Sequence, residues 1–556
     1  MAFLVSPGVQ VKEIDMTNVV PATSSSTGAI AGSFQWGPVD EITTVSSETQ
    51  LVKIFGQPND DTYHSVLSAA NFLSYGNSLR VVRAVGSSAL NASSGASGLL
   101  IKNDTHAVGI SGQDVVARYP GVVGNSIGIS ICPASSAAFT AWTWKGSFSA
   151  APGTSTGTAA VSGSNDEVHV VVYDATGGIT GTINTILETY EYLSQGSDAK
   201  DASGSSNYVK DVLNAKSAWV RIITITELAN LGDVIASTTF DTTIEGAGDN
   251  IYTKSLAHGV DDNAIGASET VLAYDMFADA ETVDVSLLMM SNANLSTTDN
   301  ETVCDKLISI ASARKDCVAF VSPTFAMVTA AALLTWRTSL TSSTYGFADS
   351  SALYVYDKYN DKYRWLAASS SMAGLVAHTD STADAWFSPA GFSRGNLRNV
   401  IKLAYNPKQV DRDDLYKVGI NPIVTFPGKG TVLYGDKTLQ TKASAFDRIN
   451  VRRLFIVLEK AISTASKASL FEFNDEFTRA QFRNMVEPFL RDVKGRRGVT
   501  DFKVVCDDTN NTGNVIDTNR FVADIYIKPA RSINFITLNF IATRTGVEFS
   551  EIAGGS

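Results

Sequence analysis

The chain has 556 residues, of which 44% are hydrophobic and 18% are charged. These values are typical of a globular protein and exclude a largely disordered chain. The length predicts about three or four domains, because a single hydrophobic core does not grow to this size. Lys and Arg number 44 against 56 Asp and Glu, so the formal net charge is −12.

The charge is unevenly distributed along the chain. Residues 440–500 hold 12 Lys and Arg against 7 Asp and Glu, whereas residues 87–270 hold 8 against 18. The acidic middle indicates a solvated exterior, and the basic region near the C-terminus indicates a surface for an acidic partner. The alternative for the basic region is an ordinary solvated face.

The cysteines and the apolar segments argue against secretion and membrane insertion. Cys132, Cys304, Cys317 and Cys506 form no Cys-x-x-Cys motif, which favours small buried side chains in a reducing compartment. The first residues have neither the basic part nor the long apolar part of a secretory signal. The most apolar run, Phe325–Trp336, is too short to cross a bilayer and predicts a buried helix.

The N-terminal segment predicts an isolated strand. Val9–Ile14 begins by alternating apolar and polar residues, and no hairpin partner follows it closely. The next segment, Thr23–Gly28, is rich in Ser and Thr and is expected to be flexible. A strand on such a tether is suited to pairing with a distant part of this chain or with another chain.

Two stretches, 23–85 and 268–405, predict α/β structure. Strand, helix and strand follow one another in the second stretch at a spacing that predicts a parallel crossover unit. The intervening stretch, 86–267, is rich in Gly, Ser and Thr with short β-type runs, and it predicts one or two inserted β-rich domains with an exposed surface. The expected strands are 79–85, 127–131, 168–173, 283–289, 317–321 and 351–356, and the expected helices are 63–75 and 299–314.

The C-terminal part predicts a further domain. Gly435 and Asp436 lie between two β-type runs, which is typical of a hairpin turn. Residues 453–468 have one apolar helical face. A second helix is expected after Asn474 as N-cap, with Phe477 on its buried side and a kink or break at Pro488. Three strands should follow, at 501–506, 520–527 and 533–545.

Together these patterns predict an α+β multidomain protein. Its central and C-terminal domains have an α/β core, the inserted part is β-rich and lies on the outside, and both ends are extended strand arms. The expected boundaries are 1–22, 23–85, 86–267, 268–405, 406–532 and 533–556.

Two stretches approach known motifs for phosphate or calcium binding, but each departs from its motif at a residue that the binding requires. Residues 430–437 approach the spacing of a phosphate-binding loop, but Asp436 stands where a phosphate would lie. Residues 508–519 open like a calcium loop but end in Asn519 instead of Glu. The five histidines are scattered. These observations favour a protein without catalytic residues, metal or cofactor.

Two basic clusters, Arg452-Arg453 and Lys494–Arg497, are candidates for nucleic-acid contact. No stacking aromatics alternate with them and the chain is acidic, so an acidic protein is the favoured partner.

Several stretches resemble contractile tail sheath proteins, which form the outer tube of myophage tails and of related injection particles. One of these stretches, Ser388–Gly395 with the sequence SPAGFSRG, is most similar to the sheaths of T-even-like phages, and so is the chain length. The inserted stretch 86–267 carries none of these motifs. The stretches are Ser6–Val9 with Glu13-Ile14, Ser388–Gly395, Asn421–Leu439, Asn450–Leu454 and Thr543–Gly546.

The resemblance implies a structural subunit of the virion tail. Such subunits form hexameric rings stacked helically round an inner tube, and they are assembled in the host cytoplasm. Their terminal arms donate strands to the C-terminal domains of neighbouring subunits. When the baseplate gives the trigger, the rings move closer and drive the tube through the host envelope. The implied partners are further copies of the chain and the tube, baseplate and terminator proteins, without direct nucleic-acid binding or membrane insertion.

Two groups of residues are candidates for these contacts. The first group represents the arms that pair between subunits, namely Val9, Val11, Ile14, Ile536, Leu538, Phe540 and Ile541. The second group is basic and is expected to face the tube, namely Arg491, Lys494, Arg496 and Arg497.

Three alternatives remain open from the sequence. The chain could be the sheath of a phage-tail-like bacteriocin or of another contractile injection system. It could also form a non-contractile filament or shell. A glycan-binding or glycan-cleaving protein would use Trp142, Trp144 and Trp219 of the insert, although no pair of carboxylates marks a catalytic site there.

Overall fold

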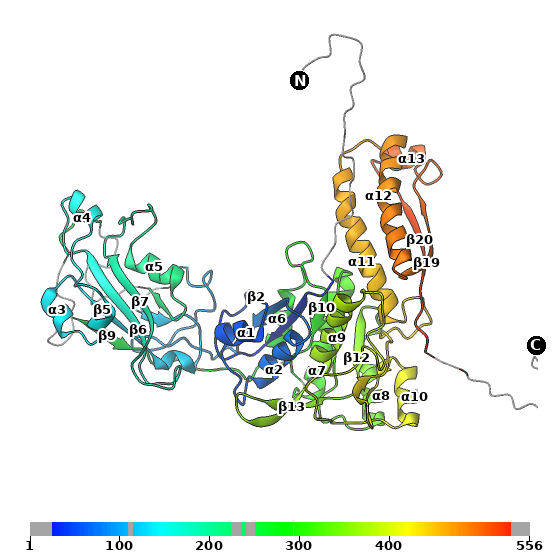
Figure 1. Cartoon of the computed structure of the whole chain (residues 1–556), viewed down its shortest axis with the longest axis horizontal. Coiled ribbons are helices and arrows are strands. Elements are labelled where there is room, and N and C mark those ends of the chain that lie inside the picture. The colour runs from blue at the N-terminus through cyan, green and yellow to red at the C-terminus, as the bar shows by residue number, and fades with distance from the viewer. Residues whose placement is uncertain are drawn as a thin grey trace, which may run out of the picture. The chain divides into compact units, whose positions relative to one another are not determined.

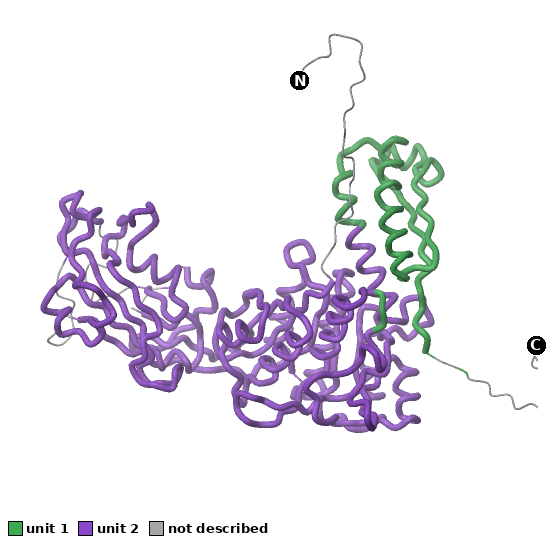
Figure 2. The backbone as a smooth tube through the Cα atoms, in the orientation of Figure 1, with its two compact units in different colours: residues 1–21, 386–388, 462–556 green, residues 22–385, 389–461 purple. Residues whose placement is uncertain are grey.

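The computed structural model describes residues 25–108, 110, 115–223, 235–240, 251–292, 294–534 and 537. The chain divides into two compact units, which Figure 2 shows in different colours. The larger unit comprises residues 22–385 and 389–461, and the smaller unit comprises residues 1–21, 386–388 and 462–556.

A seven-stranded sheet forms the core of the larger unit, in the order β16-β12-β11-β10-β1-β3-β2. Its neighbours pair in parallel except β2, which runs antiparallel to β3. The central strands β1, β10 and β11 are buried on both faces, which explains why their residues are apolar and do not alternate with polar ones. The strands are β1 (Gly28–Gly32), β2 (Ile42–Val45), β3 (Leu79–Arg83), β10 (Leu287–Met289), β11 (Val318–Val321), β12 (Gly346–Asp349) and β16 (Ile420–Asn421).

Helices cover both faces of this sheet (Figure 1). Successive strand residues point to opposite sides, so Leu287 and Met289 enter one apolar cluster and Leu288 enters the other. The first cluster includes residues of α1 (Glu48–Phe55), α2 (Tyr63–Leu73) and α9 (Ser369–Thr382). The second includes residues of α6 (Ala267–Asp275), α7 (Thr297–Arg314), α8 (Ala330–Ser339) and α10 (Gln409–Lys417).

The predicted parallel crossover is confirmed, because α7 connects the parallel strands β10 and β11. The strand expected at 351–356 is not part of this sheet. It corresponds to β13 (Leu353–Asp357), which pairs antiparallel with β14 (Lys362–Leu366) and β15 (Lys402–Leu403). The connection from β13 to β14 is too short for a parallel crossover. The strand that pairs with β11 in the parallel sheet is β12. The sheet is extended by β16, which lies after the expected domain boundary at residue 405.

The stretch between β3 and α6 is β-rich, as predicted. A four-stranded antiparallel sheet has the order β7-β6-β5-β9, and β4 pairs with β8. The strands are β4 (Val115–Ala117), β5 (Ile127–Cys132), β6 (Glu167–Asp174), β7 (Thr185–Ser194), β8 (Val220–Ile222) and β9 (Tyr252–Ser255). Short helices surround them, namely η1 (Val122–Ser126), α3 (Ser136–Ala141), η2 (Lys145–Ser147), α4 (Thr156–Ala160) and α5 (Val209–Lys216).

A hairpin follows β16, but its turn is not the predicted one. β17 (Ile423–Phe426) pairs antiparallel with β18 (Gly430–Leu433). The chain turns where Gly428 and Gly430 adopt φ angles of 72° and 78°, which glycine accepts without strain. The turn expected at Gly435 and Asp436 is therefore wrong. Asp436 is buried and accepts hydrogen bonds from Arg448 and Tyr416 instead.

The smaller unit contains a long helix packed on a two-stranded sheet (Figure 1). Helix α11 (Ile449–Ser466) spans the boundary between the units in the sequence. The elements that follow are η3 (Lys467–Ser469), α12 (Glu476–Gly495), β19 (Val499–Val505), α13 (Gly513–Asp517) and β20 (Asp524–Pro529).

Three details of α12 differ from the prediction. Its N-cap is Asp475, whose carboxylate accepts a hydrogen bond from the backbone N–H of Thr478 at 2.8 Å. The helix is not broken at Pro488 but continues to Gly495, because buried side chains on both sides of the proline hold it against the sheet. Phe477, expected on the buried side, is 65% exposed.

Candidate interaction surfaces

The basic residues predicted from the sequence gather at the C-terminal end of α12, and we call them the basic end: Arg491, Lys494, Arg496 and Arg497. All four side chains are exposed. Lys494 lies 3.1 Å from the carboxylate of Asp501 and lowers the pKa of that group. Among the described residues, neither Arg491 nor Arg497 has an acidic partner. The basic end therefore presents positive charge that is only partly neutralised.

Packing against Trp386 fixes the basic end. The Trp386 indole N–H donates a hydrogen bond to the Arg496 carbonyl oxygen at 3.1 Å, and the Arg496 guanidinium lies 5.2 Å from the centre of the ring system. A Cβ atom on Gly498 would come within 3.0 Å of the same ring. Only glycine leaves room for this contact.

The sheet of the smaller unit has two open edges within the described residues, because β19 and β20 pair only with each other. Facing side chains such as Phe502 and Ile527 are only partly buried, although they pair across the strands. Tyr526, on the opposite face, is 61% exposed. A two-stranded sheet is marginally stable, and its unpaired N–H and C=O groups are a template for another strand.

A buried ion pair fixes the residues that follow the N-terminal segment. Arg453 of α11 makes two hydrogen bonds of 2.5 Å to the Asp380 carboxylate at the end of α9. The Ser25 hydroxyl donates to the same carboxylate at 2.7 Å, and Arg453 also donates to the Ser25 carbonyl oxygen at 3.0 Å. We call these three residues the arm anchor.

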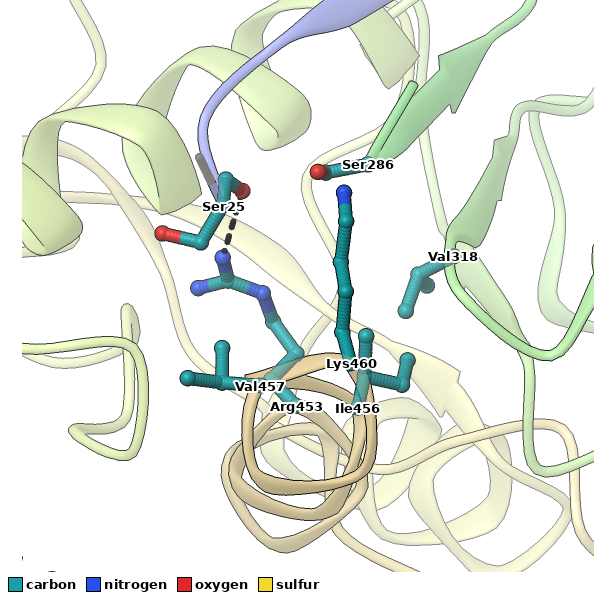
Figure 3. A pocket seen from close by; sticks show the side chains of 7 residues that line it. All are labelled: Ser25, Ser286, Val318, Arg453, Ile456, Val457 and Lys460. Carbon is teal, nitrogen blue, oxygen red and sulfur yellow. Dashed lines mark hydrogen bonds between the residues drawn. The ribbon is translucent and has the colours of Figure 1, made fainter. Parts of the chain in front are cut away.

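The arm anchor borders a small recess (Figure 3). Arg453 and Lys460 extend from α11 toward Ser25 and Ser286, which precede β1 and β10. Lys460 forms an ion pair with Asp284. The recess is lined by Ser25, Ser286, Val318, Arg453, Ile456, Val457 and Lys460. Its two cations are already paired with carboxylates of the same chain, so the recess is part of the framework.

The candidate arm residues lie outside the described part of the chain: Val9, Val11, Ile14, Ile536, Leu538, Phe540 and Ile541. No residue of the N-terminal arm, 1–22, is described, and of the C-terminal arm the structure describes only residues 533, 534 and 537. The N-terminal arm leads to the arm anchor at Ser25, and the C-terminal arm follows β20.

The sequence did not reveal the arm anchor. The sequence predicts Arg452 and Arg453 as a basic cluster available for contact, but both are about 5% exposed. Arg452 stacks on Tyr345 and Phe446, with its guanidinium 4.5 and 4.6 Å from the two ring centres. Asp380 is 73 residues from Arg453 in the sequence, so no local pattern could reveal the pair.

The residues of the alternative chemical sites make other contacts in the described structure. Asp508 pairs with Arg479 at 2.7 Å, and no group of His, Cys, Asp and Glu within the described residues could hold a metal ion. Lys437 donates to a backbone carbonyl. Trp142 is buried, whereas Trp144 and Trp219 are half-buried and pack against other rings, Trp144 at 4.5 Å from Tyr173 and Trp219 at 5.5 Å from Trp36.

No helix in the described segments has both the length and the apolar character that crossing a bilayer requires.

Comparison with protein families identifies three segments of the chain. Residues 263–439 match the phage tail sheath protein central domain, and residues 441–543 match the phage tail sheath C-terminal domain. Residues 25–84 match the tail sheath protein Gp18 domain III N-terminal region. The matched segments leave out residues 85–262, which contain the β-rich insert.

Individual relatives match over the whole chain. The tail sheath proteins of Vibrio phage KVP40 and Enterobacteria phage T4 are 35% and 34% identical to it. Each comparison covers 99% of this chain, with 100% of the first relative and 99% of the second.

Solved structures share the fold. A sheath tail protein from Listeria innocua matches with a TM-score of 0.54 at 13% identity, covering 92% of this chain and 97% of that one. The sheath complex of PVC, an extracellular contractile injection system, in its contracted state matches with a TM-score of 0.52 at 12% identity, covering 98% and 99%.

The fold is thus shared with sheath proteins of contractile systems. The chain belongs to the phage tail sheath protein family and is a structural component of contractile phage tails. The predicted resemblance is thereby confirmed, including its T-even-like character. The prediction of a structural protein rather than an enzyme is confirmed by the same relatives.

Proposed function

We propose that the chain assembles into hexameric rings that stack helically around the inner tail tube and contract to drive this tube through the host envelope. Assembly takes place in the host cytoplasm, and the sheath contacts the baseplate at one end and the terminator protein at the other. Family membership supports this proposal. Direct nucleic-acid binding and membrane insertion are not part of it.

Strand exchange links the subunits. The observation that carries this step is that β19 and β20, in the segment matched by the sheath C-terminal domain, pair with no further strand among the described residues. The arms, 1–22 and 533–556, add strands to these edges in neighbouring subunits. Main-chain hydrogen bonds made in this way survive rotation of the donor subunit when the tether is flexible, so the array stays connected while the rings move.

Deleting residues 1–20 tests strand exchange. The truncated chain keeps Ser25 and the rest of the arm anchor, so we expect it to fold and remain monomeric. Sedimentation and electron microscopy of the full and truncated chains, with and without tube, provide the measurement. Ordered tubes from the truncated chain would contradict the proposal.

A finer test changes only the apolar positions of the N-terminal arm. Replacing Val9 and Val11 by Asp should prevent polymerisation, because these two side chains share one face of the strand and a charged face is not buried on the sheet. The matched control replaces Gln10 and Lys12 by Ser and should polymerise normally.

The basic end faces the tube in this proposal. Each exposed ion pair contributes roughly 0.2–1 kcal/mol and weakens with salt, so the attraction is loose enough to be released on contraction. The double change Arg496→Glu and Arg497→Glu should lower assembly on tubes and remove much of its salt dependence. The control, Lys200→Glu with Lys216→Glu, makes the same change of charge on the insert. Equal assembly of both variants would argue against a tube-facing basic end.

A further inference from the structure

The loop between α11 and α12, together with the first turn of α12, carries a cluster of exposed apolar side chains, which we call the aromatic tip. Phe471 is fully exposed, Phe473 is 83% exposed, and Leu470 and Phe477 are 63% and 65% exposed. Apolar side chains gathered on a surface in this way mark a site of protein contact.

Hydrogen bonds hold the aromatic tip in shape. The Asn474 amide donates to the Asn511 side-chain oxygen at 3.1 Å and to the Arg520 carbonyl oxygen at 2.8 Å. Phe471 adopts a φ of 70°, a conformation that non-glycine residues rarely accept. The loop is thus fixed to the body of the smaller unit while its phenylalanines remain in solvent.

A second exposed aromatic cluster lies on the larger unit, and we call it the aromatic platform: Phe392, Phe426 and Tyr434. The ring centres are 5.3 to 6.0 Å apart. Phe392 and Tyr434 are 47% and 46% exposed. The platform joins the SPAGFSRG stretch to the β17–β18 hairpin, because Gly391 N–H donates to the Leu433 carbonyl oxygen at 2.9 Å.

The two clusters carry opposite charge. Residues 470–477 include Glu472, Asp475 and Glu476 and no Lys or Arg. The Arg412 guanidinium lies 5.8 and 6.0 Å from two ring centres of the platform, and Lys429 is exposed in the turn beside Phe426. An acidic aromatic surface and a basic aromatic surface are complementary in both charge and apolar character.

We infer that the aromatic tip of one copy of the chain docks on the aromatic platform of a second copy. The inference rests on the proposed function, in which copies polymerise. Two different surfaces meet in such a contact, so it is heterologous and repeats from copy to copy to generate rings or helices. Phenylalanines of the tip are the buried anchors, and the charges around them fix the orientation.

Cross-linking in the assembled sheath tests the contact. Glu472→Cys and Lys429→Cys place one thiol beside each cluster and leave every aromatic ring in place, while the four native cysteines are buried. Sheaths co-assembled from the two variants and treated with a short bis-maleimide should give covalent dimers, and a chain with both changes should give a ladder of multimers. Pairing Glu472→Cys with Ser203→Cys, an exposed position on the insert, should give none.

Several outcomes would overturn the inference. Intact sheaths without the specific cross-link would exclude this contact and leave polymerisation standing. A cross-link that stays within one chain would show that the tip docks on its own platform. A full-length chain that never polymerises would remove the proposed function and this contact with it.

A charge exchange provides a second, independent test. Glu472→Lys or Lys429→Glu alone creates a like-charge contact and should raise the protein concentration needed for assembly about tenfold. The chain with both changes restores opposite charges and should assemble at nearly the wild-type concentration. Losses that simply add in the double variant would contradict the contact.

Discussion

Asp349 shows how single residues connect the layers of the larger unit. Its buried carboxylate accepts a hydrogen bond from Ser322 at 2.5 Å, and the Ser322 oxygen accepts one from the backbone N–H of Ser369 at 2.8 Å. Ser369 also donates to the Met290 carbonyl oxygen at 2.7 Å. This network ties the start of α9 to the ends of three neighbouring strands.

Burial raises the pKa of Asp349 from 3.8 to about 7. Between these values the folded chain holds a proton that the unfolded chain has lost, so stability falls as the pH rises, by up to about 1.4 kcal/mol per pH unit. Asp349→Asn should remove this dependence. Denaturant unfolding of both chains at pH 5 and pH 8 provides the measurement, and an unchanged difference between the two pH values would contradict it.

The arm anchor gives a prediction about a buried carboxylate that is paired with a cation. Arg453→Met leaves the Asp380 carboxylate buried without its cation, which destabilises by about 3–5 kcal/mol. Calorimetry should show the larger unit melting earlier. Adding Asp380→Leu should recover much of the loss, because the buried pair is then replaced by apolar groups. Arg491→Met, at an exposed position, is the control and should leave the melting temperature unchanged.

At the scale of the element, local sequence patterns predicted which helices and strands form better than they predicted which strands pair. The helix at 63–75 and the β10–α7–β11 crossover were predicted because apolar periodicity is a local property. The place of β13 in a separate sheet and the hairpin turn near Gly428 were missed. Both depend on contacts with strands or buried side chains that are distant in the sequence, and the residues of the segment itself do not specify these contacts.

The contact between α9 and Tyr75, which follows α2, gives an element-scale prediction. A Cβ atom added to Gly374 of α9 would lie 2.5 Å from the Tyr75 ring. Gly374→Ala should therefore lower the melting temperature, although alanine is the better helix former by about 1 kcal/mol. The control, Gly495→Ala in α12, has open space around the added atom and should be neutral or stabilising. A stabilised Gly374→Ala chain would show that α9 and Tyr75 pack less tightly than described.

For the whole molecule, composition and sequence motifs predicted more than they did for strand pairing and turns. The family resemblance, the β-rich insert and the exposed basic end all followed from residues that stand close together in the sequence. The aromatic tip was not predicted, because Phe477 continues the apolar pattern of α12 and a helical pattern alone places it inside. Its exposure is explained at the level of the assembly, where a second copy covers it.

Electron cryo-microscopy of the assembled sheath tests strand exchange most directly. The account predicts that the sheet of β19 and β20 in each subunit gains strands from the terminal arms of its neighbours, with Val9 and Val11 facing the same side of that sheet. A map in which this sheet remains two-stranded, with both arms folded onto their own subunit, would contradict it.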